Sequence, residues 1–172
     1  MKALELANYV ICYANDKFPD NTITHLKLQK ILYYIVTSCL KKNKDIANIF
    51  SDGEAIEKWQ FGPVIPSVYN EFKSYGGRPI TSPSLNIAFE ENGDDLDFSF
   101  EEFNSEKFAE ENPEIAEIAV LVINNLIKKD AFTLVDMTHN EKAWSSFEEN
   151  IKKGDRDLIY SNNELRSATA II

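Results

Sequence analysis

Few side chains in this chain could carry out covalent chemistry. The sequence of 172 residues contains two cysteines and two histidines. A thiol nucleophile requires an imidazole base at about 3 Å. His25 and Cys39 fall on one predicted helix, where their spacing corresponds to about 21 Å at 1.5 Å per residue. His139 with Cys12 is geometrically possible, but no local motif supports that pair, so we do not expect a Cys–His hydrolase.

Metal and phosphate chemistry are not expected either. A metal site would require His25, His139 and several acids to converge, and scattered residues of these types are more often surface or core. The sequence has no glycine-rich phosphate loop, no Cys-x-x-Cys pair and no His-Glu-x-x-His motif. We therefore expect no enzyme, no cofactor and no metal. The alternative is an enzyme with a deep pocket around one of the two histidines.

The charge of the chain is concentrated in one segment. The net charge is −10. The segment 86–117 contains twelve acids and a single base, Lys107, so it accounts for the whole imbalance. Lysine and arginine provide the grip on a phosphate backbone, so we do not expect direct nucleic-acid binding. The acidic segment favours either a solvated face or a surface that steers a basic protein partner.

Apolar runs and cysteine usage bear on the compartment. The longest apolar run extends from Ile118 to Ile123, whereas a membrane span needs about 20 residues. The first residues carry an acid and no unbroken apolar core, so we expect no secretory signal. We expect Cys12 and Cys39 to be buried, reduced thiols. Together these features predict a cytoplasmic protein without a membrane span.

The second helix is the most informative element. Thr24 can cap a helix that extends to about Lys42. At about 100° per residue, one face of this helix is apolar and the opposite face carries lysines and a tyrosine. We predict that the apolar face is core and that the polar face is exposed. The apolar face comprises Leu28, Ile31, Leu32, Ile35, Val36 and Cys39, and the polar face comprises Lys27, Lys30, Tyr34, Thr37 and Lys41.

Local signals define the other elements. Helical spacing covers 2–18, an extended run covers 55–61, and two alternating runs at 85–89 and 96–100 predict a hairpin with a turn longer than two residues. Helix starts are predicted at Pro66, at Asn112-Pro113, at Thr138-His139-Asn140-Glu141 and at Ser161, which forms a capping box with Glu164. We predict a mainly α (α+β) fold of about five to seven helices with a small β-hairpin. Residues 1–172 would form a single domain with an acidic hairpin insertion at about 85–102.

Four motifs in this order are characteristic. They are Lys27-Leu28-Gln29-Lys30-Ile31-Leu32-Tyr33-Tyr34, then Glu57 to Tyr69 with Trp59, Gly62, Pro63 and Val64, then Tyr75-Gly76-Gly77 with Pro79-Ile80, and Leu134 to His139 followed by Trp144. The chain resembles the Panacea (SocA-type) antitoxin domain, which also occurs on phage-associated proteins. The resemblance covers about Leu4 to Phe147.

The resemblance implies a function in protein binding. Members of the family resemble antitoxins that neutralise a toxin, encoded by the adjacent gene, through direct contact. The resemblance therefore implies a toxin–antitoxin system with a cognate protein toxin as partner. The alternative is a proteolytic adaptor or phage-associated scaffold that delivers a partner to a cellular protease.

The motif residues divide into two groups. We predict that the first group contacts the partner, because exposed tyrosine and tryptophan are frequent interface anchors. This group comprises Lys27, Lys30, Tyr34, Lys41, Trp59 and Tyr69. We expect the second group to have structural roles, with Gly62-Pro63 as a corner. It comprises Leu28, Gln29, Leu32, Tyr33, Gly62, Pro63, Val64, Thr138, His139 and Trp144.

Overall fold

The computed structural model describes residues 1–42, 49–51, 53–92 and 95–172, with the backbone alone for the described residues of 86–100. These parts of the chain are mainly α-helical, as predicted, and also contain two antiparallel two-stranded hairpins. In chain order the elements are α1 (Ala3–Lys17), α2 (His25–Lys41), β1 (Glu57–Trp59), β2 (Gly62–Val64), α4 (Pro66–Phe72), η1 (Lys73–Tyr75), β3 (Asn86–Asn92), β4 (Asp95–Glu101), α5 (Ser105–Glu111), α6 (Pro113–Leu126), α7 (Ala131–His139), α8 (Lys142–Ser145), α9 (Glu148–Lys152) and α10 (Asn162–Arg166).

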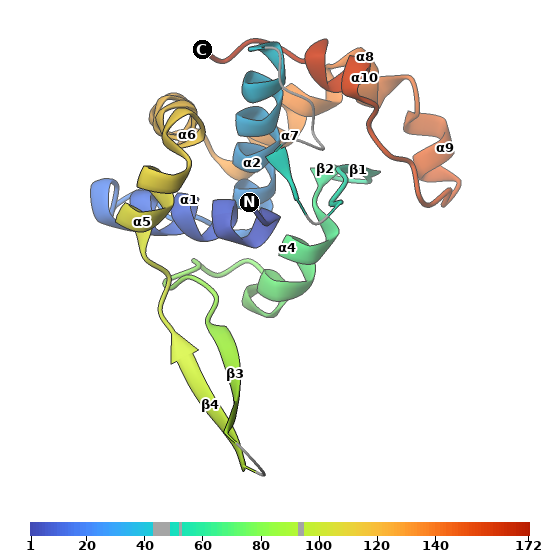
Figure 1. The fold of residues 1–172 in the computed structure, drawn as a ribbon. Helices are drawn as coiled ribbons and strands as arrows, with labels where there is room; N and C mark the ends of the chain where they lie inside the picture. The colour runs from blue at the N-terminus through green and yellow to red at the C-terminus, as the bar shows by residue number, and fades with distance from the viewer. Residues whose placement is uncertain (43–48, 52, 93–94) are drawn as a thin grey trace.

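Helix α2 stands at the centre of the molecule (Figure 1). It contacts α1, α4, α6, α7, α10 and strand β2. Thr24 caps its first turn, because the threonine hydroxyl accepts a hydrogen bond from the backbone N–H of Lys27. All residues from Lys27 to Leu40 are buried, so the helix is surrounded on every side.

This burial overturns one expectation. The polar face of α2 was predicted to be exposed, but Lys27, Lys30, Tyr34 and Thr37 are buried and only Lys41 is exposed. The reason is that β2, α7 and α10 pack on α2, and the buried polar atoms find acceptors at Ile127, Pro63, Glu141 and the carbonyl of Tyr34. Transfer of a polar group from water to the interior costs little free energy when the group is hydrogen-bonded there.

Helix α6 packs beside α2 and confirms its predicted start. Asn112 is the N-cap residue and Pro113 occupies the first turn, where the missing N–H of proline has no partner to lose. Ile115, Ile118, Val122 and other apolar residues of α6 are buried against α2 and α1. Within the described residues, no helix combines the length and the apolarity needed to cross a membrane.

Only the first strand of the short hairpin β1–β2 was predicted from the sequence. Trp59 pairs with Gly62, and Glu57 pairs with Val64. Gly62 was expected to end the extended run, but it opens the returning strand instead. Its φ of +90° lies in the left-handed region that favours glycine, as its place at a corner predicted.

The hairpin β3–β4 is the predicted acidic hairpin, and it extends away from the helices (Figure 1). Pairing begins at Asn86 with Glu101 and continues to Asn92 with Asp95. The expected turn longer than two residues is therefore wrong, because the ladder extends through most of the segment assigned to it. Residues 93 and 94, between the strands, lie outside the described residues.

The start predicted at Thr138 is also wrong. Thr138 and His139 lie at the end of α7, and the next helix, α8, begins after Glu141. The Thr138 hydroxyl donates to the carbonyl of Val135, 2.8 Å away, rather than capping a new helix. The capping box of Ser161 and Glu164 at the start of α10, in contrast, is confirmed.

The two cysteines lie on helices α1 and α2. Cys39 is buried in α2 as expected, whereas Cys12 in α1 is half-buried, and neither forms a disulfide.

Candidate functional site

The motif residues of α2 hold the β1–β2 hairpin through hydrogen bonds to its backbone. The Lys30 ammonium donates to the carbonyl of Pro63 at 3.0 Å. The Gln29 side chain accepts from the N–H of Ile65 at 2.8 Å and donates to the carbonyl of the same residue at 3.4 Å. Two consecutive side chains of a helix thus fix the strand that returns from the hairpin turn.

Gly62 lets this strand approach the helix closely. A Cβ at position 62 would lie 2.5 Å from Oγ1 of Thr138 and 3.1 Å from Cε of Lys30. The first separation is too short for a carbon atom and the second is tight, so the lack of a side chain matters here as well as the positive φ. The segments around Lys30, Gly62 and Thr138 therefore interlock.

Burial changes the protonation of the lysine at this crossing. Lys30 is fully buried, and desolvation lowers its pKa from 10.5 to about 7. Burial also lowers the pKa of His25 and of His139, and the charge of Lys30 lowers both further. Both imidazoles are therefore favoured in their neutral forms near pH 7.

A second polar group joins α2 to the end of the chain. The Glu141 carboxylate accepts from the hydroxyl of Tyr33 at 2.5 Å and from the hydroxyl of Tyr34 at 3.3 Å. It also accepts from the backbone N–H of Thr169 at 3.0 Å. Burial and the neighbouring Glu141 raise the pKa values of both tyrosines, so both remain donors at neutral pH.

The other face of the β1–β2 hairpin carries an aromatic cluster. The rings of Trp59 and Tyr69 lie 4.7 Å apart at an angle of 56°, and those of Tyr69 and His25 lie 4.8 Å apart at 57°. Phe61, at the turn of the hairpin, has 53% of its surface exposed. Trp144 supports the cluster from behind, because its indole N–H donates to the carbonyl of Trp59 and its ring stacks on His139.

These rings surround a cavity of about 340 Å³, which we call the aromatic pocket. The side chains that line it are neutral or apolar: His25, Leu26, Gln29, Trp59, Gln60, Phe61, Val64 and Tyr69.

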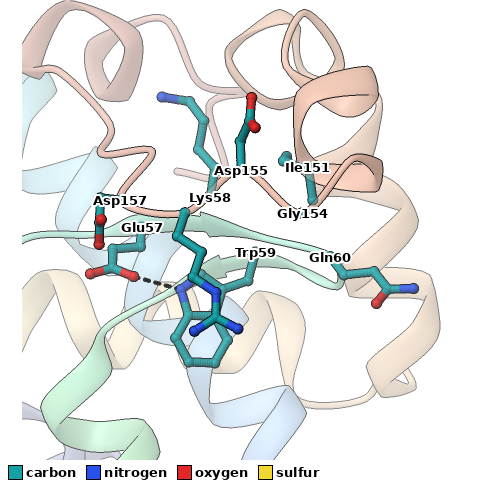
Figure 2. Close-up of a pocket in the computed structure, with 9 residues that line it drawn as sticks. Glu57, Lys58, Trp59, Gln60, Ile151, Gly154, Asp155 and Asp157 are labelled. Carbon is teal, nitrogen blue, oxygen red and sulfur yellow. Dashed lines mark hydrogen bonds between the residues drawn. The ribbon is translucent and has the colours of Figure 1, made fainter.

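A second cavity, of about 510 Å³, shares Trp59 and Gln60 with the aromatic pocket. Figure 2 shows the loop that carries Asp155 and Asp157 passing beside the hairpin, and the indole of Trp59 donating to Glu57 at 2.7 Å. Lys58 and Arg156 also line this cavity. Trp59 thus separates the aromatic pocket from a cavity that is lined by the carboxylates of Glu57, Asp155 and Asp157.

The six residues predicted to contact a partner are in different environments. Lys27, Lys30 and Tyr34 are buried, and Lys27 donates to the backbone carbonyl of Ile127. Lys41 is exposed and donates to the carbonyl of Ala168. Trp59 and Tyr69 are half-buried and stand together at the aromatic pocket. Of the six residues, only Trp59 and Tyr69 line one of the two cavities at the β1–β2 hairpin.

The residues given structural roles lie mostly in the interior. Leu28, Leu32, Tyr33 and Val64 are buried with Gln29, Gly62, Pro63, Thr138 and Trp144, and His139 is half-buried.

Sequence reasoning missed three residues of the site. Phe61 and His25 line the aromatic pocket, and Glu141 joins Tyr33 to Tyr34. The spacing of Trp59 and Phe61 by two positions in an extended run was the available signal for a shared face. Nothing local marked Glu141, because its two tyrosine partners lie more than 100 positions away and Thr169 lies 28 positions away. In the described parts of the chain, no cluster of histidine, cysteine or acids has the arrangement of a metal site.

Comparison with known proteins identifies one family. The family model described as "Antitoxin SocA-like, Panacea domain" matches residues 28–145, which is most of the chain. No curated protein and no solved structure matches the chain significantly.

Proposed function

The chain belongs to the family of SocA-like antitoxins with a Panacea domain, and on this basis we propose that it neutralises a cognate protein toxin by direct binding. The toxin would be the product of the adjacent gene. The observation that carries the proposal is the family match over residues 28–145, which extends from α2 to α8.

The aromatic pocket supports a mechanism of contact between proteins. The matched segment includes Trp59 and Phe61, which the β1–β2 hairpin presents at an accessible cavity, and Tyr69, which α4 presents there. Tryptophan and tyrosine have few rotatable bonds, so they lose little conformational entropy when a partner covers them. Their support by Lys30, Gln29 and Trp144 means that little ordering remains to be done on binding.

Co-expression with the adjacent gene tests the proposal. The neighbouring product is induced alone and together with this chain, while growth is followed and the two proteins are co-purified. We expect growth arrest by the neighbour alone, rescue by this chain, and a stable complex. A harmless neighbour, or continued arrest while this chain is present and folded, would contradict the proposal.

The half-life of the partner separates two ways of neutralising it. If binding alone blocks the toxin, its half-life in cells is unchanged or longer when this chain is present. If the chain is an adaptor, the partner disappears faster, and a purified cellular protease degrades it only when this chain is added. Direct blocking is the version that we propose, and accelerated degradation would replace it by the adaptor.

A further inference from the structure

The aromatic pocket has the chemistry of a receptor for a positively charged side chain. We propose that it binds a lysine or arginine of the partner between the rings of Trp59, Phe61 and Tyr69. This inference rests on the proposed function, because it assigns the contact through which a basic toxin would be held.

The first argument is the arrangement of the rings. The ring of Tyr69 is tilted by 56° to Trp59 and by 57° to His25, rather than stacked face to face with either. Tilted rings around a cavity leave part of their faces free to line it. The face of an aromatic ring carries partial negative charge and attracts a cation that lies within about 6 Å of the ring centre.

The second argument is the charge around the pocket. No lysine or arginine lines it, and the pKa of its imidazole, His25, is lowered by burial. The nearby Lys30 points to the carbonyl of Pro63 and is fully buried. The lining of the pocket thus holds no cation, although the charge of Lys30 reaches His25.

The third argument concerns Trp59 itself. Its indole N–H donates to the carboxylate of Glu57 at 2.7 Å, and a hydrogen bond to an anion shifts electron density onto the ring. Asp155 and Asp157 line the cavity on the other side of Trp59, beside Arg156. Three carboxylates there face the Arg156 guanidinium and the Lys58 ammonium, and Lys58 is already paired with Glu164 at 3.2 Å, so this rim is acidic. Charge complementarity therefore favours a cationic occupant over a purely apolar one.

Arginine amide added to the chain alone tests the proposal. The two indole N–H signals, of Trp59 and Trp144, are followed by nuclear magnetic resonance at constant ionic strength. We expect a saturable shift of the Trp59 signal with a dissociation constant on the order of millimolar, as suits a single side chain. Citrulline amide, which is neutral and similar in shape, and norleucine amide, which is apolar, should shift it much less.

Substitutions test whether the rings are responsible. Phe61→Leu and Tyr69→Leu keep apolar bulk but remove an aromatic face, and each should weaken arginine amide about threefold to fivefold. Phe132→Leu on α7 is the matched control, because Phe132 is also exposed but lies outside the pocket. The Trp144 signal reports folding, since its N–H donates to the carbonyl of Trp59.

Three results would overturn the proposal. They are an equal or larger shift with norleucine amide or citrulline amide, no saturable shift with arginine amide, or no difference between the pocket variants and Phe132→Leu. Because the probe replaces the toxin, the result is independent of the co-expression experiment. Binding of arginine amide without rescue by co-expression would leave the pocket assignment intact and remove the antitoxin function.

Discussion

Lys30 occupies a position at which a charged side chain is costly. Its ammonium lies in the interior with the carbonyl of Pro63 as a hydrogen-bond acceptor, and no carboxylate among the described residues forms an ion pair with it. Desolvation therefore lowers its pKa to about 7. Lys30 thus links the packing of α2 on β2 to pH.

The first prediction concerns this linkage. Between pH 7 and 10.5 the unfolded chain holds a proton at Lys30 that the folded chain has released, so the free energy of unfolding should rise with pH. The slope from this group is about 1.4 kcal/mol per pH unit at most. Urea unfolding at several pH values from 7.5 to 9.5 should give a smaller slope for Lys30→Met than for the natural chain.

An exposed lysine provides the control for this measurement. Lys129→Met removes a lysine from the surface and should leave the slope unchanged. Equal slopes for Lys30→Met and the natural chain would show that Lys30 stays charged in the folded state.

The second prediction concerns Gly62. Alanine at this position must adopt a φ of +90° and place its Cβ 2.5 Å from Oγ1 of Thr138. We expect Gly62→Ala to lower the free energy of unfolding by about 2 kcal/mol or more. Gly77→Ala is the matched control, because a Cβ there meets nothing within 4 Å, and it should change stability by less than about 0.5 kcal/mol. Similar denaturation midpoints for the two variants would be evidence against the close crossing.

At the scale of the element, α2 is a helix whose polar side is as buried as its apolar side. Its polar side chains bind neighbouring segments: Gln29 and Lys30 bind β2 and the residue after it, while Tyr33 and Tyr34 bind Glu141. These bonds give α2 a defined rotation about its axis, which apolar packing alone specifies less sharply.

The third prediction tests the bond between α2 and Glu141. Glu141→Gln keeps the shape of the side chain, but its amide nitrogen cannot accept a hydrogen bond from a tyrosine hydroxyl. We expect a loss of about 1–3 kcal/mol in the free energy of unfolding. Glu117→Gln, at an exposed position of α6, should have almost no effect when measured in the same way. A neutral outcome at position 141 would mean that the two tyrosines find other acceptors.

The elements that could be predicted from the sequence are those whose signal is local. The starts of α6 and α10 follow from Asn112-Pro113 and from the capping box of Ser161, each of which lies within one helical turn. Alternation predicted the β3–β4 hairpin for the same reason. The prediction that the polar face of α2 is exposed was wrong, because helical spacing shows which residues share a face but not which elements cover that face.

The start predicted at Thr138 shows a related limit. A threonine followed three positions later by a glutamate resembles a capping box. In the folded chain the Thr138 hydroxyl donates to the preceding turn, and Glu141 accepts from Tyr33 more than 100 positions earlier. The aromatic pocket was only half anticipated, through Trp59 and Tyr69, because its assembly also depends on distant contacts.

At the scale of the whole molecule, the acidic segment and the aromatic pocket are separated. Figure 1 shows β3–β4 extending from the helices and α5 beside α1 and α6, both away from β1 and β2. If the partner is basic, as we propose, the acids of 86–117 would act on it mainly through their long-range field, whereas the pocket would act on contact.

The fourth prediction follows from this separation. The association rate with the purified partner should fall about tenfold from low to high salt, because salt screens the field. Glu106→Gln with Glu110→Gln, on the exposed side of α5, should slow association at low salt and leave dissociation unchanged. Asp20→Asn with Asp136→Asn removes the same charge from outside the segment and should slow it less. A rate that is independent of salt would exclude steering.

The base of the β3–β4 hairpin has a consequence for how such a protein can diversify. Asn86 faces Glu101 across the ladder, so the chain leaves the body and returns to it at nearly one place. Insertions or deletions of matched residue pairs would change the reach of this appendage while its anchoring points stay put. Related proteins could thus carry hairpins of different length, each suited to a different binding partner, while the helical core stays unchanged.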